Sequence, residues 1–414
     1  MYLLLAIFAV AFPIVSLPCV VWQYCNQRKV LSAAIVVGIA MSVISMGIVN
    51  IGGGDLTAYS LEISKYNSLQ FSEIWELKYA NYPLASIVFW LISKTGNPHL
   101  LQAVIGFVEY MVLAYIVFDF SKIHNLQNKQ IVCGVIAIIV FIPLFSSVSA
   151  VRSTPALAIG LLALYRDVVK GKRDIATIVL YVAPLAIHAT GLSMLLVRLI
   201  SLIANKSFMA SAAIGFSVIP ILLVFGQLFS GLFQFFGVNP IELLLSYVDQ
   251  GSIGWSSVVS ASTFYQLFRV LNIIFAVYVI FDICIRIMKM TYQDIEKGRL
   301  SVTVAGLALI VGFAVFVTDP SFMRYSYAIY PLVVLHVMMG LSRETNICSR
   351  DNGFHTEQER KSNYKYIAVA KWIYVLFGLT FLISHIYLMS LGAAVEPFIA
   401  TLFFGPLGSP WLLG

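Results

Sequence analysis

The sequence predicts an all-α polytopic integral membrane protein with broken or re-entrant segments. Apolar residues make up 60% of its 414 positions and charged residues only 11%, and the mean hydropathy is +0.91. A soluble domain carries about 25% charged residues. Because a spanning helix needs about 20 apolar residues, the chain has room for about 10–12 of them. We expect one transmembrane domain over residues 1–414, with outer loops near 50–98 and 227–260 and an inner loop near 342–365.

The strongly apolar stretches are expected to cross the membrane. They cover residues 3–22, 31–49, 99–118, 131–149, 152–168, 208–226, 262–284, 301–318, 322–341 and 366–390. The first is interpreted as a span and not a cleaved signal peptide, because it lacks a basic n-region and a small-residue cleavage site. Stretch 83–93 is too short to cross, and stretch 175–203 is interrupted at His188-Ala189-Thr190-Gly191. We interpret both as broken or re-entrant elements, which occur in membranes only where they line a protein cavity.

The positions of the basic residues support this topology. With both termini outside, all but six of the 26 Lys and Arg residues fall in inner segments, as the positive-inside rule requires. If either weak stretch crossed the membrane, every later segment would change sides and the bias would collapse. The net charge of +7 then reflects loop cations beside anionic lipid, and not nucleic-acid binding. The six exceptions are Lys65, Lys78, Lys94, Arg152, Arg269 and Arg324.

Arg152 and Arg324 each open an apolar stretch from the outer side. An intramembrane cation costs about 3 kcal/mol on insertion scales, so such a residue usually faces a wet cavity and binds an anion. Guanidinium groups match phosphate oxygens bidentately, and a helix N-terminus adds its own positive field. The pair therefore predicts a pyrophosphate clamp. The alternatives are that Arg152 snorkels to lipid phosphate and that Arg324 forms a salt bridge with Asp319, which could also orient it toward a ligand.

Other candidate site residues share the outer face. His188, at the interruption of an apolar stretch, is a candidate general base or donor to a leaving phosphate, or else a structural histidine. Asp55 follows three glycines and precedes Tyr59, so it is either a proton acceptor or a helix N-cap. Arg269 is expected to contact substrate more deeply in its span or to pair with Glu109, the one acid well inside a predicted span. The outer loops contain no HExxH motif or paired carboxylates, so we expect no metal and no cofactor.

In this order, these motifs resemble the Wzy/EpsG-type polymerases of O-antigen and exopolysaccharide repeat units, from about residue 30 to residue 341. Family members typically show Asp-Tyr-x-x-Tyr where this chain has Asp55-Leu56-x-x-Tyr59, an Arg-Gln start where it has Arg152-Ser153, and Phe-His where it has Ile187-His188. The charged groups are therefore kept and their neighbours differ. The other matching elements are Tyr79/Tyr82-Pro83 and Arg324-Tyr325.

The resemblance implies a fold similar to the GT-C class of membrane glycosyltransferases and a reaction at the periplasmic face of the bacterial inner membrane. A growing glycan would be transferred from undecaprenyl pyrophosphate to a lipid-linked repeat unit, without a metal. Arg152, Arg324, His188 and Asp55 would be catalytic. The implied partners are undecaprenyl-pyrophosphate-linked glycans, membrane lipid, a chain-length regulator and a flippase. The implied substrate-binding residues are Tyr59, Tyr82, Arg269, Asp319 and Tyr325.

Two other functions remain open on the sequence. An O-antigen ligase usually carries its key histidine in a long outer loop, and the outer loop near 227–260 contains no histidine. A flippase or other transporter tends to show internal repeats and polar residues at mid-membrane. No convincing repeat is present here, and the unusual polar residues collect on one face.

Overall fold

The protein is described by a computed structural model over residues 1–48, 55–77, 79–234, 263–289, 294–316, 322–347, 369–383, 386 and 395–408, in which all regular structure is helical. The first half contains α1 (Tyr2–Ala11), α2 (Pro13–Gln27), α3 (Val30–Met46), α4 (Asp55–Tyr66), η1 (Ile74–Glu76), α5 (Pro83–Ser93), α6 (Leu100–Ile123), α7 (Asn128–Phe141), α8 (Leu144–Ser149), α9 (Ser153–Val168), α10 (Ile175–Val182), η2 (Ala183–Ala186), η3 (Ala189–Gly191) and α11 (Leu192–Ile203). The second half contains α12 (Phe208–Gln234), α15 (Thr263–Lys289), α16 (Asp294–Phe316), α17 (Phe322–Ile347), a helix over Val369–Ile383 and α19 (Val395–Gly408).

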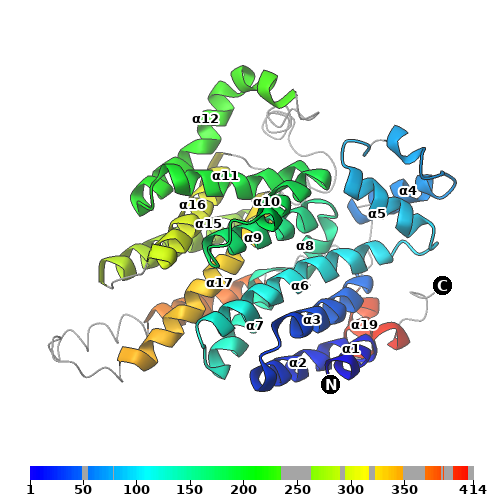
Figure 1. The fold of residues 1–414 in the computed structure, drawn as a ribbon, viewed down its shortest axis with the longest axis horizontal. Helices are drawn as coiled ribbons and strands as arrows, with labels where there is room; N and C mark the ends of the chain where they lie inside the picture. Colours follow the sequence, from blue (N-terminus) through cyan, green and yellow to red (C-terminus); the bar gives the residue numbers. More distant parts are fainter. Residues whose placement is uncertain are drawn as a thin grey trace.

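Three of the described helices are long and apolar enough to cross a membrane: Leu100–Ile123, Gln266–Met288 and Glu296–Phe316. Other apolar helical segments are shorter and include Phe208–Leu222 within α12 and Ala328–Gly340 within α17. Figure 1 shows α6 beside α3, with α4 and α5 together next to the start of α6, and α9 among α10, α11, α16 and α17. The all-helical prediction is therefore confirmed for the described residues, together with helices suited to a membrane.

Prolines alter two of the predicted spans. Span 3–22 is two helices that meet at Phe12, and the second continues to Gln27. Span 131–149 is also wrong as one helix, because α7 ends at Phe141 and α8 begins after Pro143. Proline has no N–H to donate and its ring clashes with the preceding turn, so it bends or ends a helix. The predicted outer loop 227–260 begins too early in the sequence, because α12 continues to Gln234.

The stretch 175–203 is a helical hairpin interrupted where the sequence predicted, and its re-entry into a membrane stays a prediction; we call it the re-entrant hairpin. Its two ends bind neighbouring residues at the C-terminal end of α9: Asp174 pairs with Arg166 at 2.9 Å, and Arg198 pairs with Asp167 at 2.6 Å. The hairpin turns at η2 and η3, where a Cβ at Gly191 would lie only 2.2 Å from the Cβ of Pro184. The chain therefore leaves and returns to the same end of α9, and its tip points toward the other end.

The predicted inner cations gather around that C-terminal end of α9, which we call the cation-rich end (Arg166, Lys170, Arg173 and Arg198). Lys170 pairs with Asp119 at the end of α6 at 2.9 Å, and Arg173 pairs with Asp167 at 2.9 Å. Arg299, near the start of α16, lies over the ring of Phe120 at 5.6 Å. Arg152 lies at the opposite end of α9, which we call the Arg152 end. The structure thus separates the two groups of cations along the helices as the sequence predicted.

Candidate functional site

Arg152 is held at the break between α8 and α9. The backbone leaves helical geometry at Ala150, and Arg152 occupies the N-cap position of α9. Its Nε donates a hydrogen bond of 3.1 Å to the hydroxyl of Tyr59. Its guanidinium carbon lies 4.2 Å from the ring centre of Tyr79, 5.0 Å from that of Tyr82 and 5.9 Å from that of Tyr59. Three tyrosines therefore surround this half-buried cation.

The tyrosines come from two elements that are far from Arg152 in sequence. Tyr59 lies on α4, and Tyr79 and Tyr82 form the turn before Pro83 begins α5. That turn is closed by the Tyr82 N–H donating to the Tyr79 carbonyl at 2.8 Å and by Ser86 donating to the same carbonyl at 2.9 Å. Proline at the first helical position is favoured because its N–H would have no intrahelical partner there. The turn is therefore fixed locally, and it presents both rings to Arg152.

The rings act as neutral π surfaces. Burial raises the pKa of the Tyr79 phenol far above its usual range, with a further contribution from Tyr59, although nearby Arg152 opposes it. Burial also raises the pKa of Tyr82, again against the effect of Arg152. A guanidinium over the face of such a ring gains about 0.5–2 kcal/mol. Among the described side chains, these rings stabilise the charge of Arg152 and no carboxylate neutralises it.

Arg152 also keeps donor capacity. Its buried Nη1 has no hydrogen-bond partner within the described ranges. A buried N–H of a charged group without an acceptor costs several times more than the net gain of an ordinary hydrogen bond. The arrangement is therefore more favourable when an anionic oxygen lies against this side of the guanidinium, and the start of α9 adds the positive end of a helix dipole.

His188 joins this cluster through Tyr82. The two rings are stacked, with centres 5.8 Å apart and an interplanar angle of 16°. His188 is extended at the tip of the re-entrant hairpin, and its Nδ1 accepts from the Thr190 N–H at 3.2 Å and lies 3.0 Å from the Thr190 hydroxyl. A ring nitrogen that accepts from a backbone N–H carries no proton, so the neutral ring has its proton on Nε2. This geometry suits a hydrogen-bond donor better than a general base.

The structure thus brings together Arg152, His188, Tyr59 and Tyr82 of the predicted site. It adds Tyr79, the ring nearest to Arg152. Its signal in the sequence was the aromatic turn before Pro83, where the ring that faces Arg152 could not be identified without the fold.

Three other predicted site residues have side chains that the structure does not describe. Asp55 opens α4, one turn before Tyr59, and Arg324 lies in the first turn of α17, but their side chains are outside the described parts, as is the whole of Asp319. Tyr325 packs on Phe313 with ring centres 5.2 Å apart. The second half of the pyrophosphate clamp therefore stays a prediction.

The environment of Arg269 differs from the predicted pairing with Glu109, whereas its predicted contact with substrate stays a prediction. Its Nε donates to the Ala314 carbonyl at 2.6 Å and its Nη2 to that of Val315 at 3.4 Å, both in the last turn of α16. Carbonyls at a helix C-terminus have no intrahelical partner and carry the negative end of the dipole, so a cation stabilises them. The expected pairing with Glu109 is wrong, and Arg269 caps α16 instead.

The sequence also missed a buried polar cluster around Asp282 on α15. Its carboxylate accepts from Arg286 at 3.0 Å, from His336 at 2.8 Å and from Tyr374 at 2.9 Å. These contacts tie together α15, α17 and the helix Val369–Ile383, and every donor faces the one carboxylate. The available signal was a histidine and an acid inside apolar stretches, but their pairing depends on helix rotation.

In the described parts of the chain, no group of three or more His, Cys, Asp or Glu side chains is placed to hold a metal ion. In comparisons with known proteins, no family model, no curated protein and no solved structure matches the chain.

Proposed function

We propose that this protein is a GT-C-like membrane glycosyltransferase that polymerises lipid-linked oligosaccharide repeat units at the periplasmic face of the bacterial inner membrane. The growing glycan would leave undecaprenyl pyrophosphate and join the repeat unit carried by a second lipid. The observation that carries the proposal is the caged Arg152, a cation with unused donor capacity at a helix N-terminus beside His188.

The chemistry of such a transfer needs what this cluster offers. An acceptor hydroxyl attacks the anomeric carbon, and the bond from that carbon to the pyrophosphate oxygen breaks, so the leaving group takes the electron pair. Fixed donors aimed at the developing charge are usually the largest contribution to catalysis. Arg152 is such a donor, and Arg324 would be its counterpart. His188 with its proton on Nε2 would donate to the departing phosphate, and Asp55 would accept the hydroxyl proton.

The aromatic cage explains why an arginine is required. A cation paired with a carboxylate would have to give up that pair to bind a phosphate. Arg152 is held by ring faces and by one neutral hydroxyl, so its charge remains available to an anion. The resemblance to Wzy/EpsG-type polymerases, which rests on Asp55, Tyr59, Tyr82, Arg152, His188 and Arg324, supports the same conclusion.

The test is a reconstituted reaction. Purified protein in liposomes with lipid-linked repeat units and EDTA should build longer lipid-linked chains, measured by gel separation or mass spectrometry. His188→Ala should slow transfer by about a hundredfold, because a lost proton-transfer group costs that much or more. The matched control is Ser193→Ala. Ser193 lies on the same hairpin, and its hydroxyl donates to the Thr190 carbonyl.

Other outcomes would assign a different function. Repeat units that change leaflets without a new glycosidic bond would make the protein a flippase. Transfer of glycan to a lipid A acceptor, with no polymer, would make it an O-antigen ligase. Lengthening that requires added magnesium would overturn the metal-free mechanism.

A further inference from the structure

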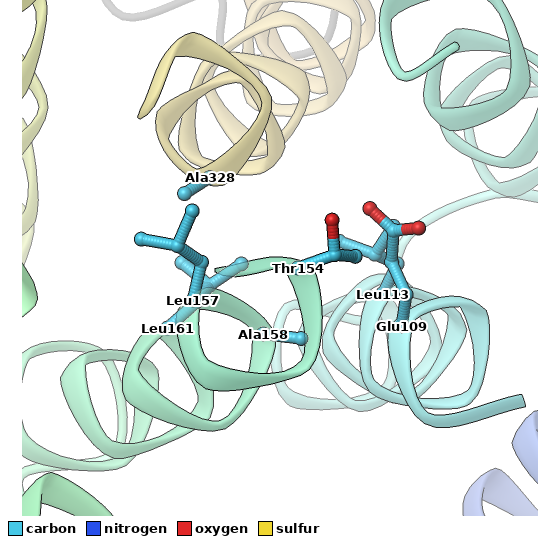
Figure 2. Close-up of a pocket in the computed structure, with 7 residues that line it drawn as sticks. All are labelled: Glu109, Leu113, Thr154, Leu157, Ala158, Leu161 and Ala328. Atoms are coloured by element: carbon cyan, nitrogen blue, oxygen red, sulfur yellow. The ribbon is translucent and has the colours of Figure 1, made fainter. Parts of the chain in front are cut away.

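A second feature of the fold lies behind the Arg152 cage and is independent of the proposed function. α6, α9 and α17 enclose a small cavity of about 20 Å³, lined by Glu109, Leu113, Thr154, Leu157, Ala158, Leu161 and Ala328. Figure 2 shows that the Glu109 carboxyl and the Thr154 hydroxyl supply its polar atoms, among aliphatic side chains. A cavity needs about 10–15 Å³ to hold one water molecule, so this cavity has room for one.

Glu109 has no partner in this cavity. Its side chain is on α6 and is 5% exposed, and its Oε2 has no hydrogen-bond partner. The Ser147 hydroxyl on α8 faces the carboxyl, but it too is buried and outside hydrogen-bond geometry. Thr154 donates to the Ser147 carbonyl at 2.6 Å, so the oxygen of its hydroxyl can still accept. Polar atoms from α6 and α9 therefore line the cavity, and the Ser147 hydroxyl on α8 faces the same carboxyl.

Among the described side chains, no cation lines the cavity around Glu109, and its remaining lining residues are uncharged. Four described charged or titratable groups on α6, α9 and α17 are engaged in other contacts: Arg152 with Tyr59, Tyr110 with the Ile142 carbonyl, Tyr330 with Asn272, and His336 with Asp282. The side chain of Arg324 on α17 lies outside the described parts. An isolated buried carboxylate is very costly, and such a group normally neutralises itself. A single proton neutralises the buried carboxylate, whereas a hard metal cation needs six or more oxygen ligands.

We propose that this cavity is a buried proton site, in which Glu109 is a protonated acid and one water molecule bridges it to Ser147 and Thr154. The water has three polar partners, which is the usual number for a buried water. The acid is a positioning residue, because Thr154 lies two residues after Arg152 in the first turn of α9. Loss of the proton would put an unpaired charge beneath that turn, so alkaline pH would destabilise the junction of α8 and α9 that carries Arg152.

The first test is spectroscopic and needs no enzymatic activity. The carbonyl stretch of a protonated carboxylic acid is separate from the bands of a carboxylate. The infrared spectrum of purified wild-type protein near neutral pH should contain an acid band that Glu109→Gln lacks. The matched control is Glu62→Gln on α4. Glu62 is also buried, but it is ion-paired with Lys65 at 2.6 Å, so its loss should remove no acid band.

The second test is thermodynamic. If folded protein holds a proton on Glu109 that unfolded protein releases, the unfolded state binds fewer protons and stability must fall as pH rises. Above about pH 5, where an unfolded glutamate has lost its proton, the unfolding equilibrium of wild type should shift by up to about tenfold per pH unit relative to Glu109→Gln. The apparent melting temperature in detergent, with Glu62→Gln as control, measures this difference.

A third variant tests the bridging water. Ser147→Ala removes a hydroxyl that has no other hydrogen bond, so it should leave the fold intact and move the acid band to higher frequency, because a hydrogen bond to the carbonyl lowers that frequency. An unchanged band would show that Ser147 is not bridged. Absence of a Glu109-dependent acid band, or a wild-type melting temperature that rises with sodium but not with potassium, would overturn the proposal, because Glu109 would then be ionised.

Discussion

The two ends of α9 treat positive charge in opposite ways. At the cation-rich end, Arg166, Lys170, Arg173 and Arg198 each contact a carboxylate within 3 Å. At the Arg152 end, the cation contacts three tyrosines, and none of the carboxylates whose side chains are described pairs with it. Charges that are matched locally have little left to offer a ligand, so they hold the fold together. A charge held by ring faces keeps its field, so it can bind an anion.

The cation-rich end also shows how firmly matched charges fix local structure. Asp174 caps α10, accepting from the Thr177 N–H at 2.9 Å, and it pairs with Arg166. The hydrogen bonds from Thr177, with the contribution of Arg166, lower the pKa of Asp174 to about 2. The start of the re-entrant hairpin is therefore fixed mainly by this N-cap, whose carboxylate stays ionised over the physiological pH range. The hairpin can then present His188 at its tip.

The largest expected effect comes from Arg152→Lys. Lysine keeps the charge but is a compact ammonium, which cannot stack on Tyr79 and donate to Tyr59 and to a phosphate in one plane. We expect polymerisation in the reconstituted assay to fall by about a hundredfold to a thousandfold, as for loss of a donor to a developing anion. Arg173→Lys, at an exposed arginine of the cation-rich end, is the control and should retain its rate.

If Arg152→Lys and Arg324→Lys were both fully active, the clamp hypothesis would be wrong. The contrast between the two ends of α9 would then describe only packing, and Arg152 would be an interfacial arginine. Protein levels and melting temperatures of the variants separate a chemical defect from misfolding.

A smaller effect is expected at the other end of α9, and on stability. Asp167→Asn leaves Arg198, which is only 13% exposed, without its carboxylate. Removing one partner of a buried charged pair costs about 2 kcal/mol, so the apparent melting temperature should fall while the rate per folded molecule stays close to that of wild type. Asp174→Asn is the control, because asparagine is an equally good N-cap and the half-exposed pair with Arg166 contributes little. A rate defect larger than the loss of folded protein would mean that the cation-rich end has a part in transfer.

The sequence predicted the contrast between the two ends of α9. The physical reason is that hydropathy and charge can be followed along the chain without knowledge of how the helices pack. Hydropathy predicted the interruption of the stretch 175–203, and the positions of Lys and Arg separated Arg152 from the cations at the other end of α9. The proline at position 143, which splits span 131–149, was an available signal that the hydropathy pattern masked. The predictions failed where the outcome depends on helix rotation. Arg269 caps α16 and Glu109 faces a cavity because of how the helices pack, and the spacing of residues along the chain encodes neither arrangement.

The smallest expected effect tests whether the Tyr59 hydroxyl only holds Arg152 or also contacts the substrate. Tyr59→Phe keeps the ring beside Arg152 but removes the hydroxyl that accepts from Nε at 3.1 Å. One such hydrogen bond contributes about 1 kcal/mol, so polymerisation should fall by about fivefold, with little change in melting temperature. Tyr66→Phe is the matched control, since Tyr66 lies on the same helix and packs on Phe89 in the same aromatic cluster, without a hydrogen bond to Arg152. A loss at Tyr59 as large as that of Arg152→Lys would mean that its hydroxyl contacts the substrate directly. Equal rates for both phenylalanine variants would mean that the ring faces alone hold the guanidinium.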